Sequence, residues 1–336
     1  MKIVSVLLKY DYGIPERGES GEKRVFIPAL REVCDNLVPF WLEEHSFFTD
    51  RNILQKEIID FVDKENPDVV CFCLLRDEVS LETISKLSKK YITINWFGDD
   101  QWRFDDFTKY VAPKFTYSVT IDKFCLEKYK KIGYKNVIFT HMAICDYVKD
   151  LDLKNVDYKY DISFVGGKNT VREWIVNCLR RKYNVECFGA GWQNGRVSYD
   201  EFKDIVVHSK INLNLSNSVC HDIRYITASE KNKQEYVRSR KRVEQIKGRN
   251  FEIPCFGGFQ LSKYAPSIED YFDIGKEIVV YNNIDDLELY IEYYLNHDLE
   301  RRKILEAGYK RAKNYTHIES FKKVFKKIKE TYKDEN

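Results

Sequence analysis

The chain has 336 residues, more than one hydrophobic core usually organises, so we expect two domains of roughly 150 residues each. Hydrophobic residues make up 43% of the chain and charged residues 32%, a balance that excludes a disordered protein. The formal net charge of +2 excludes a general affinity for polyanions, so nucleic acid is not an expected partner. Any phosphate has to be held at a local site.

The start of the chain carries no recognisable export signal. Its longest apolar run, Ile3–Leu8, is too short for a signal-peptide core or a membrane span, and Asp11 soon follows. We therefore expect a cytoplasmic protein. The nine cysteines are scattered, and several lie in apolar runs such as Val69–Cys73, which favours reduced core thiols over a disulfide or metal framework.

Short apolar runs alternate with longer amphipathic stretches, the pattern of strands and helices in an α/β protein with parallel sheets. A first series of strands is expected at residues 2–8, 69–75, 91–97, 116–121 and 137–141. A second series is expected at residues 161–166, 184–188, 211–215, 258–262 and 278–281. The polar stretch 150–155 separates them, which predicts two Rossmann-like domains, 1–153 and 154–318.

The chain after the last expected strand is helical in pattern. Gly308 is expected to interrupt one helix. Thr316–Glu319 then has the spacing of a capping box and precedes an apolar stripe. The stripe consists of Phe321, Val324, Phe325 and Ile328. A terminal helix 319–336 that returns towards the N-terminal domain would bury it.

One segment, Ser218–Lys247, breaks the alternation because it contains no expected strand. Basic residues crowd the stretch from residue 231 to 249, which overlaps its second half, with Glu235 and Glu244 among them and Glu230 directly before them. This basic segment can be a contact surface for an anionic acceptor, a partner or the membrane periphery. The alternative is a solvated helix or mobile loop.

The stretch from Gly248 to Gly258 has the features of a short helix that meets a phosphate. Asn250 can cap the helix, Pro254 is tolerated near its start, and Gly257 and Gly258 can end it after about two turns. The free amides of a helix start attract a phosphate, and Arg249 adds a bidentate contact. Glu252 can accept hydrogen bonds from the two vicinal hydroxyls of a ribose. The alternative is a plain capped helix.

These residues also carry a resemblance to a known family. Lys247–Leu261, followed by Tyr271–Tyr281 and Ala307–Tyr309, resembles the C-terminal domain of CgeB-like glycosyltransferases, relatives of the large retaining GT-B class. Asp161–Gly167 and Phe188–Trp192 extend the resemblance upstream, to about half of the chain. It implies a GT-B fold, in which two Rossmann-like domains with parallel sheets face a cleft and the C-terminal helix packs back across the junction.

The resemblance also implies an activity. GT-B enzymes transfer a sugar from a nucleotide-diphosphate donor to an acceptor hydroxyl, in general without a metal or another cofactor. The nucleotide sugar would bind the C-terminal domain. The acceptor, a glycan, a lipid-linked sugar or a protein, would bind the N-terminal one.

The retaining class uses an E-x7-E motif, whose second glutamate holds the ribose and whose first lies near the donor sugar. Glu252 matches the second position, and Glu244 stands eight residues before it. Since 53 of 336 residues are acidic, a chance match of Glu244 is the alternative.

A glycine pair after the first strand of the second series predicts a further part of the donor site. Gly166 and Gly167 let the backbone approach a ligand, and Lys168 and Arg172 are placed to neutralise a diphosphate. In the larger class a basic pair after this strand contacts the diphosphate. Trp192, which follows the next strand, forms part of a nucleobase wall or packs in a tight turn.

In the N-terminal half, Asp99 and Asp100 directly follow an expected buried strand, at the end where open sheets bind ligands. Either carboxylate can act as the base for an acceptor hydroxyl, and an exposed Trp102 can stack on a sugar, with Arg103 beside it. The alternative is an acidic helix cap. CgeB-like proteins have a similar Asp-Asp-x-Trp-Arg stretch, but the resemblance assigns it no role.

Three further residues of the N-terminal half are candidates. His141 ends a strand near the expected domain junction and can face the cleft, although a lone histidine there is more often structural. In GT-B enzymes the loop after the first strand borders the cleft, which makes Tyr12 and Gly13 candidates.

Three alternative functions stay open. Asp99–Asp100 can be compared with the metal-binding acidic motif of GT-A enzymes, although that motif is Asp-x-Asp. A GT-B-shaped epimerase and a non-catalytic sensor or scaffold for nucleotide sugars would both share the donor site.

Overall fold

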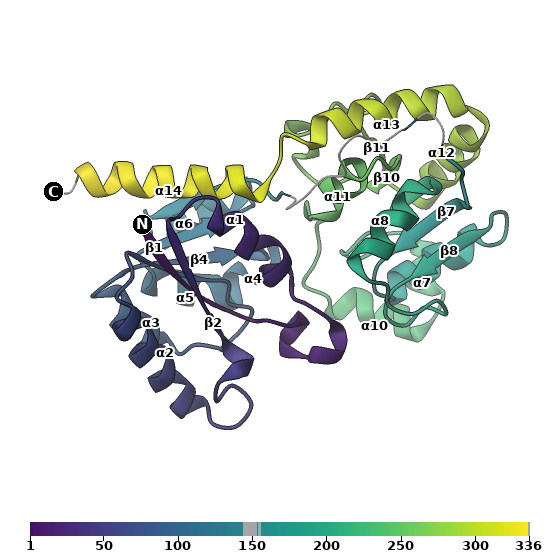
Figure 1. The fold of residues 1–336 in the computed structure, drawn as a ribbon. Coiled ribbons are helices and arrows are strands. Elements are labelled where there is room, and N and C mark those ends of the chain that lie inside the picture. Colours follow the sequence, from purple (N-terminus) through teal and green to yellow (C-terminus); the bar gives the residue numbers. More distant parts are fainter. Residues whose placement is uncertain (144–152, 154–155, 335–336) are drawn as a thin grey trace. The chain divides into compact units, whose positions relative to one another are not determined.

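The computed structural model describes residues 1–143, 153 and 156–334. They form two α/β units, each built on one parallel sheet (Figure 1). The N-terminal unit consists of Met1–Cys145 and Thr316–Asn336, and the C-terminal unit of Asp146–Tyr315. The expected boundary after residue 153 and most of the expected linker lie outside the described residues.

The sheet of the N-terminal unit has the strand order β2-β1-β3-β4-β5-β6, with every pair parallel. The strands are β1 (Lys2–Leu7), β2 (Asn36–Trp41), β3 (Val69–Phe72), β4 (Ile92–Phe97), β5 (Tyr117–Thr120) and β6 (Val137–Phe139). Strand β2 is not among the expected strands. It lies at the edge of the sheet, where Pro39 is tolerated although it has no N–H to donate.

Helices cover both faces of this sheet. Alternate residues of β1 point to opposite faces, so Val4 packs with helices α2 (Arg51–Glu65) and α3 (Leu81–Ser88), while Ile3 packs with α1 (Ile27–Arg31) and α14 (His317–Asp334). The apolar stripe of α14 is buried in this second cluster. The helices of the unit are α1 (Ile27–Arg31), α2 (Arg51–Glu65), α3 (Leu81–Ser88), α4 (Asp100–Arg103), α5 (Lys109–Val111), α6 (Leu126–Lys131) and α14 (His317–Asp334).

The sheet of the C-terminal unit has the order β11-β10-β9-β7-β8, again parallel throughout. Its strands are β7 (Tyr160–Val165), β8 (Val185–Phe188), β9 (Ser209–Asn214), β10 (Gln260–Lys263) and β11 (Val279–Tyr281). From β7 the chain moves to β8 on one side and then returns to β9 on the other. The direction of winding therefore changes between β7 and β9.

Seven helices of the C-terminal unit are described. They are α7 (Thr170–Leu179), α8 (Tyr199–Val207), α9 (Ile223–Thr227), α10 (Glu230–Arg238), α11 (Arg249–Cys255), α12 (Ile284–Asn296) and α13 (Asp298–Ala312). The segment 218–247 contains α9 and α10 and no strand, as expected. Gly308 does not interrupt α13, because its role is packing: a Cβ there would lie 2.3 Å from the Glu277 carbonyl oxygen.

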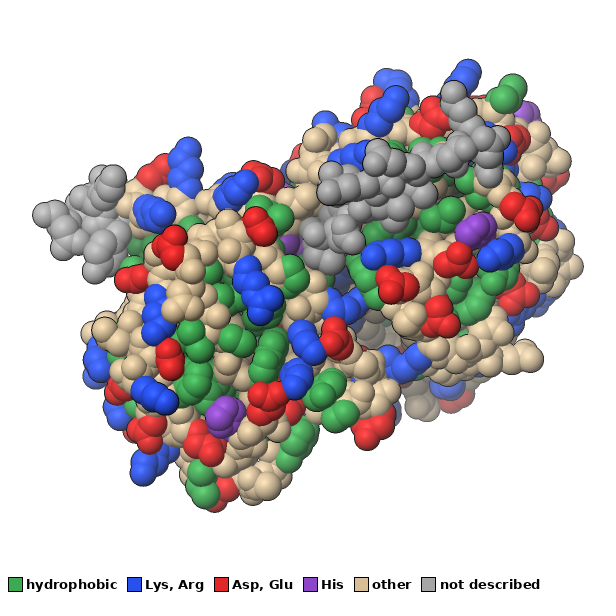
Figure 2. Space-filling model, in the orientation of Figure 1, with side chains coloured by type: hydrophobic (Ala, Val, Ile, Leu, Met, Phe, Trp, Pro, Cys, Tyr) green, Lys and Arg blue, Asp and Glu red, His purple; other side chains and the backbone are tan. Residues whose placement is uncertain are grey.

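The surface matches the balanced composition. Lys and Arg side chains are interspersed with Asp and Glu side chains over the face seen in Figure 2. The eight described cysteines are free thiols, and Cys145 lies outside the described residues. Within the described ranges, no helix is both long enough and apolar enough to cross a membrane.

Candidate functional site

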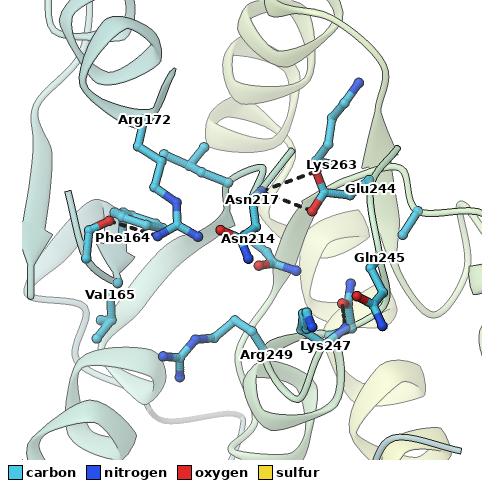
Figure 3. Close-up of a pocket in the computed structure, with 15 residues that line it drawn as sticks. Phe164, Val165, Arg172, Asn214, Asn217, Glu244, Gln245, Lys247, Arg249 and Lys263 are labelled. Carbon is cyan, nitrogen blue, oxygen red and sulfur yellow. Dashed lines mark hydrogen bonds between the residues drawn. The ribbon is translucent and has the colours of Figure 1, made fainter. Parts of the chain in front are cut away.

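A pocket of about 250 Å³ lies at the carboxyl ends of β7 and β9 in the C-terminal unit (Figure 3). Phe164–Gly167, at the end of β7, form one side, and Asn214, Leu215 and Asn217, after β9, form another. The winding of the sheet reverses between these two strands, so the connecting segments leave in opposite directions. Open α/β sheets bind their ligands at such a point.

The pocket is strongly cationic. Of the described residues that line it, four are basic, Arg172, Lys247, Arg249 and Lys263, and one is acidic, Glu244. The side chains of Arg172 and Arg249 extend into the same space from two different helices (Figure 3). A local excess of positive charge on a chain with a net charge of only +2 suits a small dianion such as a diphosphate.

Arg172 is held across the two strand ends. Its backbone N–H donates to Oδ1 of Asn169 at 2.9 Å, and this hydrogen bond caps the start of α7. Its Nε donates to the Ser216 carbonyl at 3.1 Å and its Nη1 to the Gly167 carbonyl at 2.8 Å. Burial lowers the pKa of Arg172, Glu244 opposes that effect and Arg249 adds to it. An arginine nevertheless keeps its charge in proteins.

Lys263 and Arg249 line the pocket from two further elements. Lys263 ends β10, and its Nζ donates to the Asn282 carbonyl. Burial lowers the pKa of Lys263, and Glu244 opposes this shift. Arg249 begins α11, lies 3.9 Å from the centre of the Phe202 ring and pairs with Glu252 at 3.0 Å.

The two glutamates of the expected E-x7-E motif lie differently. Glu244 lines the pocket, and its carboxylate accepts hydrogen bonds from the Asn217 N–H at 3.0 Å and the Ser218 hydroxyl at 2.8 Å, as well as from the Ser216 hydroxyl. It thereby fixes the loop that follows β9. Glu252 is not among the described residues that line the pocket, and its carboxylate pairs with Arg249.

Asn250 lines the pocket but does not cap α11 as expected. It lies inside the helix, and its Oδ1 accepts from the Lys247 N–H at 2.9 Å. Its Nδ2 donates to the Ser262 hydroxyl at 3.1 Å, as does Nδ2 of Asn214 at 3.0 Å. The backbone N–H of Asn250 donates to the Lys247 carbonyl, and the backbone N–H of Glu252 donates to the Gly248 carbonyl. Both N–H groups therefore already have a hydrogen-bond acceptor within the protein.

The glycine loop after β7 lies against the loop after β8. A Cβ on Gly189, whose φ is +127°, would lie 2.3 Å from the Gly166 carbonyl oxygen, so only glycine fits there. Trp192 is 9% exposed and packs edge-on against Phe164. It is therefore packed in a tight turn, one of its two expected roles, and is not among the described residues that line the pocket.

Six of the expected donor-site residues line the pocket together: Gly166, Gly167, Arg172, Glu244, Arg249 and Asn250. Lys168 is not among the described lining residues. Lys168 forms an ion pair with Glu173 at 2.8 Å and lies 5.4 Å from the Trp192 ring. Five polar lining residues were not expected: Asn214, Asn217, Gln245, Lys247 and Lys263. Lys263 and Asn214 could have been predicted from the sequence, because each stands at the carboxyl end of an expected parallel strand.

Asp100 is buried, whereas a base for an acceptor hydroxyl has to be accessible to the substrate. Its Oδ1 accepts from the Thr108 hydroxyl and its Oδ2 from the Tyr129 hydroxyl, both at 2.7 Å. Burial raises the pKa of Asp100 to about 6. Asp99, which precedes α4, is half-buried and does not cap it with its side chain.

The other acceptor-side candidates also lie in the N-terminal unit. Trp102, in the short helix α4, is half-buried instead of exposed. Arg103 donates to the Leu75 carbonyl and lies 4.2 Å from the Phe107 ring. Burial and Lys323 lower the pKa of His141 to about 4, while Glu319 opposes them.

The loop after β1 presents Tyr12 to solvent. Tyr12 is 59% exposed, with a φ of +54°, and the Arg17 guanidinium lies 5.4 Å from its ring. Gly13 is buried with a φ of +75°, and a Cβ there would lie 3.2 Å from the Phe47 ring. Among the described residues no group of three or more His, Cys, Asp or Glu side chains is placed to hold a metal.

Comparison with known proteins relates both the sequence and the fold to glycosyltransferases. Residues 172–321 match a family described as "Glycosyl transferase-like". No curated protein matches the chain. The fold is similar to a Rickettsia africae glycosyltransferase, with 11% identity, a TM-score of 0.61 and coverage of 99% of this chain and 98% of that one.

Two more solved structures have the same fold. Anabaena HepE, solved in complex with UDP-glucose, has 9% identity, a TM-score of 0.66 and coverage of 99% of this chain and 100% of its own. The lipopolysaccharide outer core galactosyltransferase WaaB has 11% identity, a TM-score of 0.60 and coverage of 98% and 100%. The chain therefore has the GT-B fold of glycosyltransferases, and its residues 172–321 match the glycosyl transferase-like family.

Proposed function

We propose that this protein is a glycosyltransferase that moves a sugar from a nucleotide-diphosphate sugar to an acceptor hydroxyl. The observation that carries the proposal is the pocket at the β7–β9 reversal, whose lining includes four basic side chains and one carboxylate. The pocket lies largely within the segment that matches the family. HepE, with the same fold, was solved with UDP-glucose, which supports a donor of that class.

The cationic side chains suit the chemistry of the leaving group. When the bond between sugar and phosphate breaks, the diphosphate gains negative charge, and groups aimed at that charge lower the barrier. Arg172 and Arg249 can each bind phosphate oxygens in a bidentate manner, and Lys263 and Lys247 add point charges. In this proposal these side chains take the role that a metal plays in other transferases.

The two ends of the donor have separate partners in this proposal. Glu244 lines the pocket and lies near the transferred sugar. Glu252 takes the ribose hydroxyls, since a nucleotide phosphate that binds Arg249 would release Glu252 from its ion pair. The resemblance to the retaining class supports both assignments.

The acceptor and its setting belong to the proposal as well. We assign the acceptor, a glycan, lipid-linked sugar or protein, to the N-terminal unit, with Asp99 as the carboxylate that can reach it. Surface glycan or glycoconjugate synthesis in the cytoplasm fits such a substrate. Contact with the membrane periphery through 231–249 is supported by five exposed basic residues, Lys231, Lys233, Arg238, Arg240 and Arg242.

Two other functions use the same pocket. A sensor or scaffold would bind the nucleotide sugar without turnover, and an epimerase would release a free sugar or an epimer. Both differ from the transferase on the acceptor side only. The GT-A alternative loses its basis, because the chain has two parallel sheets and the GT-B fold.

Product analysis separates these functions. The protein is incubated with labelled UDP-, GDP- and dTDP-sugars, with and without glycan acceptors, and free nucleotide diphosphate is measured. Release that depends on the acceptor supports the transferase. Binding without turnover indicates the sensor, and a free epimer the epimerase. Arg172→Ala should abolish release, whereas Arg181→Ala, an exposed cation just after the same helix, should not.

A further inference from the structure

A second, larger pocket of about 370 Å³ lies beside the first in the C-terminal unit. The two pockets share Glu244 and Lys263 as lining residues. Most of the remaining wall is apolar or aromatic: Val171, Trp174, Ile175, Val219, Val243, Tyr264, Pro266, Tyr281, Ile284 and Leu287. A volume above 300 Å³ with mainly apolar walls and few polar groups is typical of small-molecule sites.

One part of the wall of this second pocket comes from the two ends of the charged segment 218–247, whose purpose the sequence left open. The Val219 N–H donates to the Lys241 carbonyl at 2.9 Å, which joins the two ends of the segment. The His221 ring lies between the Tyr236 hydroxyl and the Arg242 carbonyl, at 3.3 Å and 3.2 Å. The segment therefore forms a folded wall with internal contacts.

The charged groups of the wall all have partners within the protein. Asp222 pairs with Arg224 at 2.6 Å, and Arg242 donates to the Val237 carbonyl at 3.0 Å. Glu244 accepts from the loop after β9, and Lys263 donates to the Asn282 carbonyl. The two acidic side chains of the wall, Asp222 and Glu244, balance the two basic ones, Arg242 and Lys263, and this balance favours an uncharged ligand.

The shape of the wall favours a ring. Trp174, Tyr264 and Tyr281 present aromatic surface, and a dry cavity of roughly 150 Å³ is already large enough for benzene. Burial raises the pKa of Tyr281, so its phenol stays neutral and can donate a hydrogen bond. The rim residues Asn282 and Asn283 are exposed and offer further polar contacts.

We propose that the second pocket is a binding site for an uncharged group that carries an aromatic or aliphatic ring, next to the phosphate pocket. The group is either part of the nucleotide-sugar donor or a separate small molecule. Through Glu244 and Lys263, its occupation is coupled to binding in the first pocket; this coupling and the donor as a source of the group rest on the proposed function, whereas the site itself does not. By linkage, each ligand then changes the affinity of the other by the same factor.

Two valines of the same segment provide a matched test. Val243 is 51% exposed and lines the pocket, whereas Val237 is 65% exposed and is not among its described lining residues. Indole binding to the full chain is measured by calorimetry and ligand-observed NMR. Val243→Trp should weaken it at least tenfold, and Val237→Trp should leave it unchanged. Equal binding to both variants, or no indole binding by the wild type, overturns the proposal.

A second variant covers the case in which Val243→Trp folds poorly. Trp174→Ala removes an aromatic wall and should also weaken indole binding at least tenfold. If instead it binds indole as the wild type does, the site is not where we place it.

Competition then distinguishes the two sources of the group. Displacement of indole by a UDP-N-acyl sugar, but not by UDP, assigns the pocket to the donor. Simultaneous binding of indole and the UDP-N-acyl sugar assigns it to a separate ligand. If no nucleotide binds at all, the proposed function fails, while the indole titration still decides whether the second site exists.

Discussion

Nε1 of Trp192 donates a hydrogen bond to the Gly166 carbonyl at 2.9 Å, and this bond ties the loop after β8 to the glycine loop of the phosphate pocket. Trp192→Phe keeps an aromatic ring beside Phe164 but removes the donor. We expect a loss of about 1 kcal/mol in the free energy of unfolding, the usual net value of one hydrogen bond, and weaker nucleotide binding. Urea unfolding and a nucleotide titration measure both. A loss of affinity without any loss of stability would instead indicate direct contact with the nucleotide.

Gly189 provides a sharper test of the same loop contact. Its Cβ position lies 2.3 Å from the Gly166 carbonyl oxygen, and its φ is +127°. Gly189→Ala should therefore cost about 3 kcal/mol or more in unfolding free energy, from backbone strain and from displacement of the neighbouring loop. Gly195→Ala is the control, because Gly195 has a φ of +66° but open space around its Cβ position. If both substitutions lower the free energy of unfolding equally, backbone strain alone accounts for the effect at Gly189.

Sequence patterns predict those features of the fold that depend on residues close together in the chain. A buried strand such as β3 is read from its continuous apolar run, and Gly166 and Arg172 are read from a strand that ends in glycines before a basic helix. Strand β2 is missed because it is a half-buried edge strand that contains Pro39. Gly308 is misread because its partner, the Glu277 carbonyl, is distant in sequence.

The candidate site could be predicted only in part, for a similar reason. Lys263 and Asn214 end different strands, and only the strand order brings both beside the end of β7. Lys168 follows the glycine pair directly, yet its side chain turns to Glu173 and Trp192. Local spacing gives a residue's position on its element, whereas the direction of the side chain depends on tertiary neighbours.

Lys168 and Lys263 can be compared as candidate phosphate ligands. Lys263→Met should weaken nucleoside-diphosphate binding about tenfold, the cost of one charge-assisted contact, because Lys263 lines the pocket. Lys168→Met should change the affinity by less than a factor of about two, because Lys168 already pairs with Glu173. Calorimetric titration with UDP and GDP measures both constants. The reverse order would restore Lys168 as the phosphate ligand.

Glu252 can be tested for the ribose role. Glu252→Ala should leave the fold intact, because Glu252 is only partly buried at the start of α11, and should weaken nucleotide binding about tenfold by the loss of two hydrogen bonds. A 2′-deoxynucleoside diphosphate should bind wild type and variant with more similar constants. An affinity that rises on substitution would mean that Glu252 only neutralises Arg249, with which it pairs at 3.0 Å.

Asp100 should make the stability of the protein depend on pH. Burial raises its pKa to about 6, so folding favours the protonated carboxyl. Its contribution is fully present below the unfolded-state pKa and is lost as pH rises through 6, an effect of at most about 3 kcal/mol. Asp100→Asn cannot ionise, so its unfolding free energy should fall less than that of the wild type between pH 4 and pH 7. Chemical denaturation of both proteins across this range measures the difference. Parallel pH profiles would show that the carboxyl ionises normally in the folded state, which would return Asp100 to the candidates for an acceptor-side base.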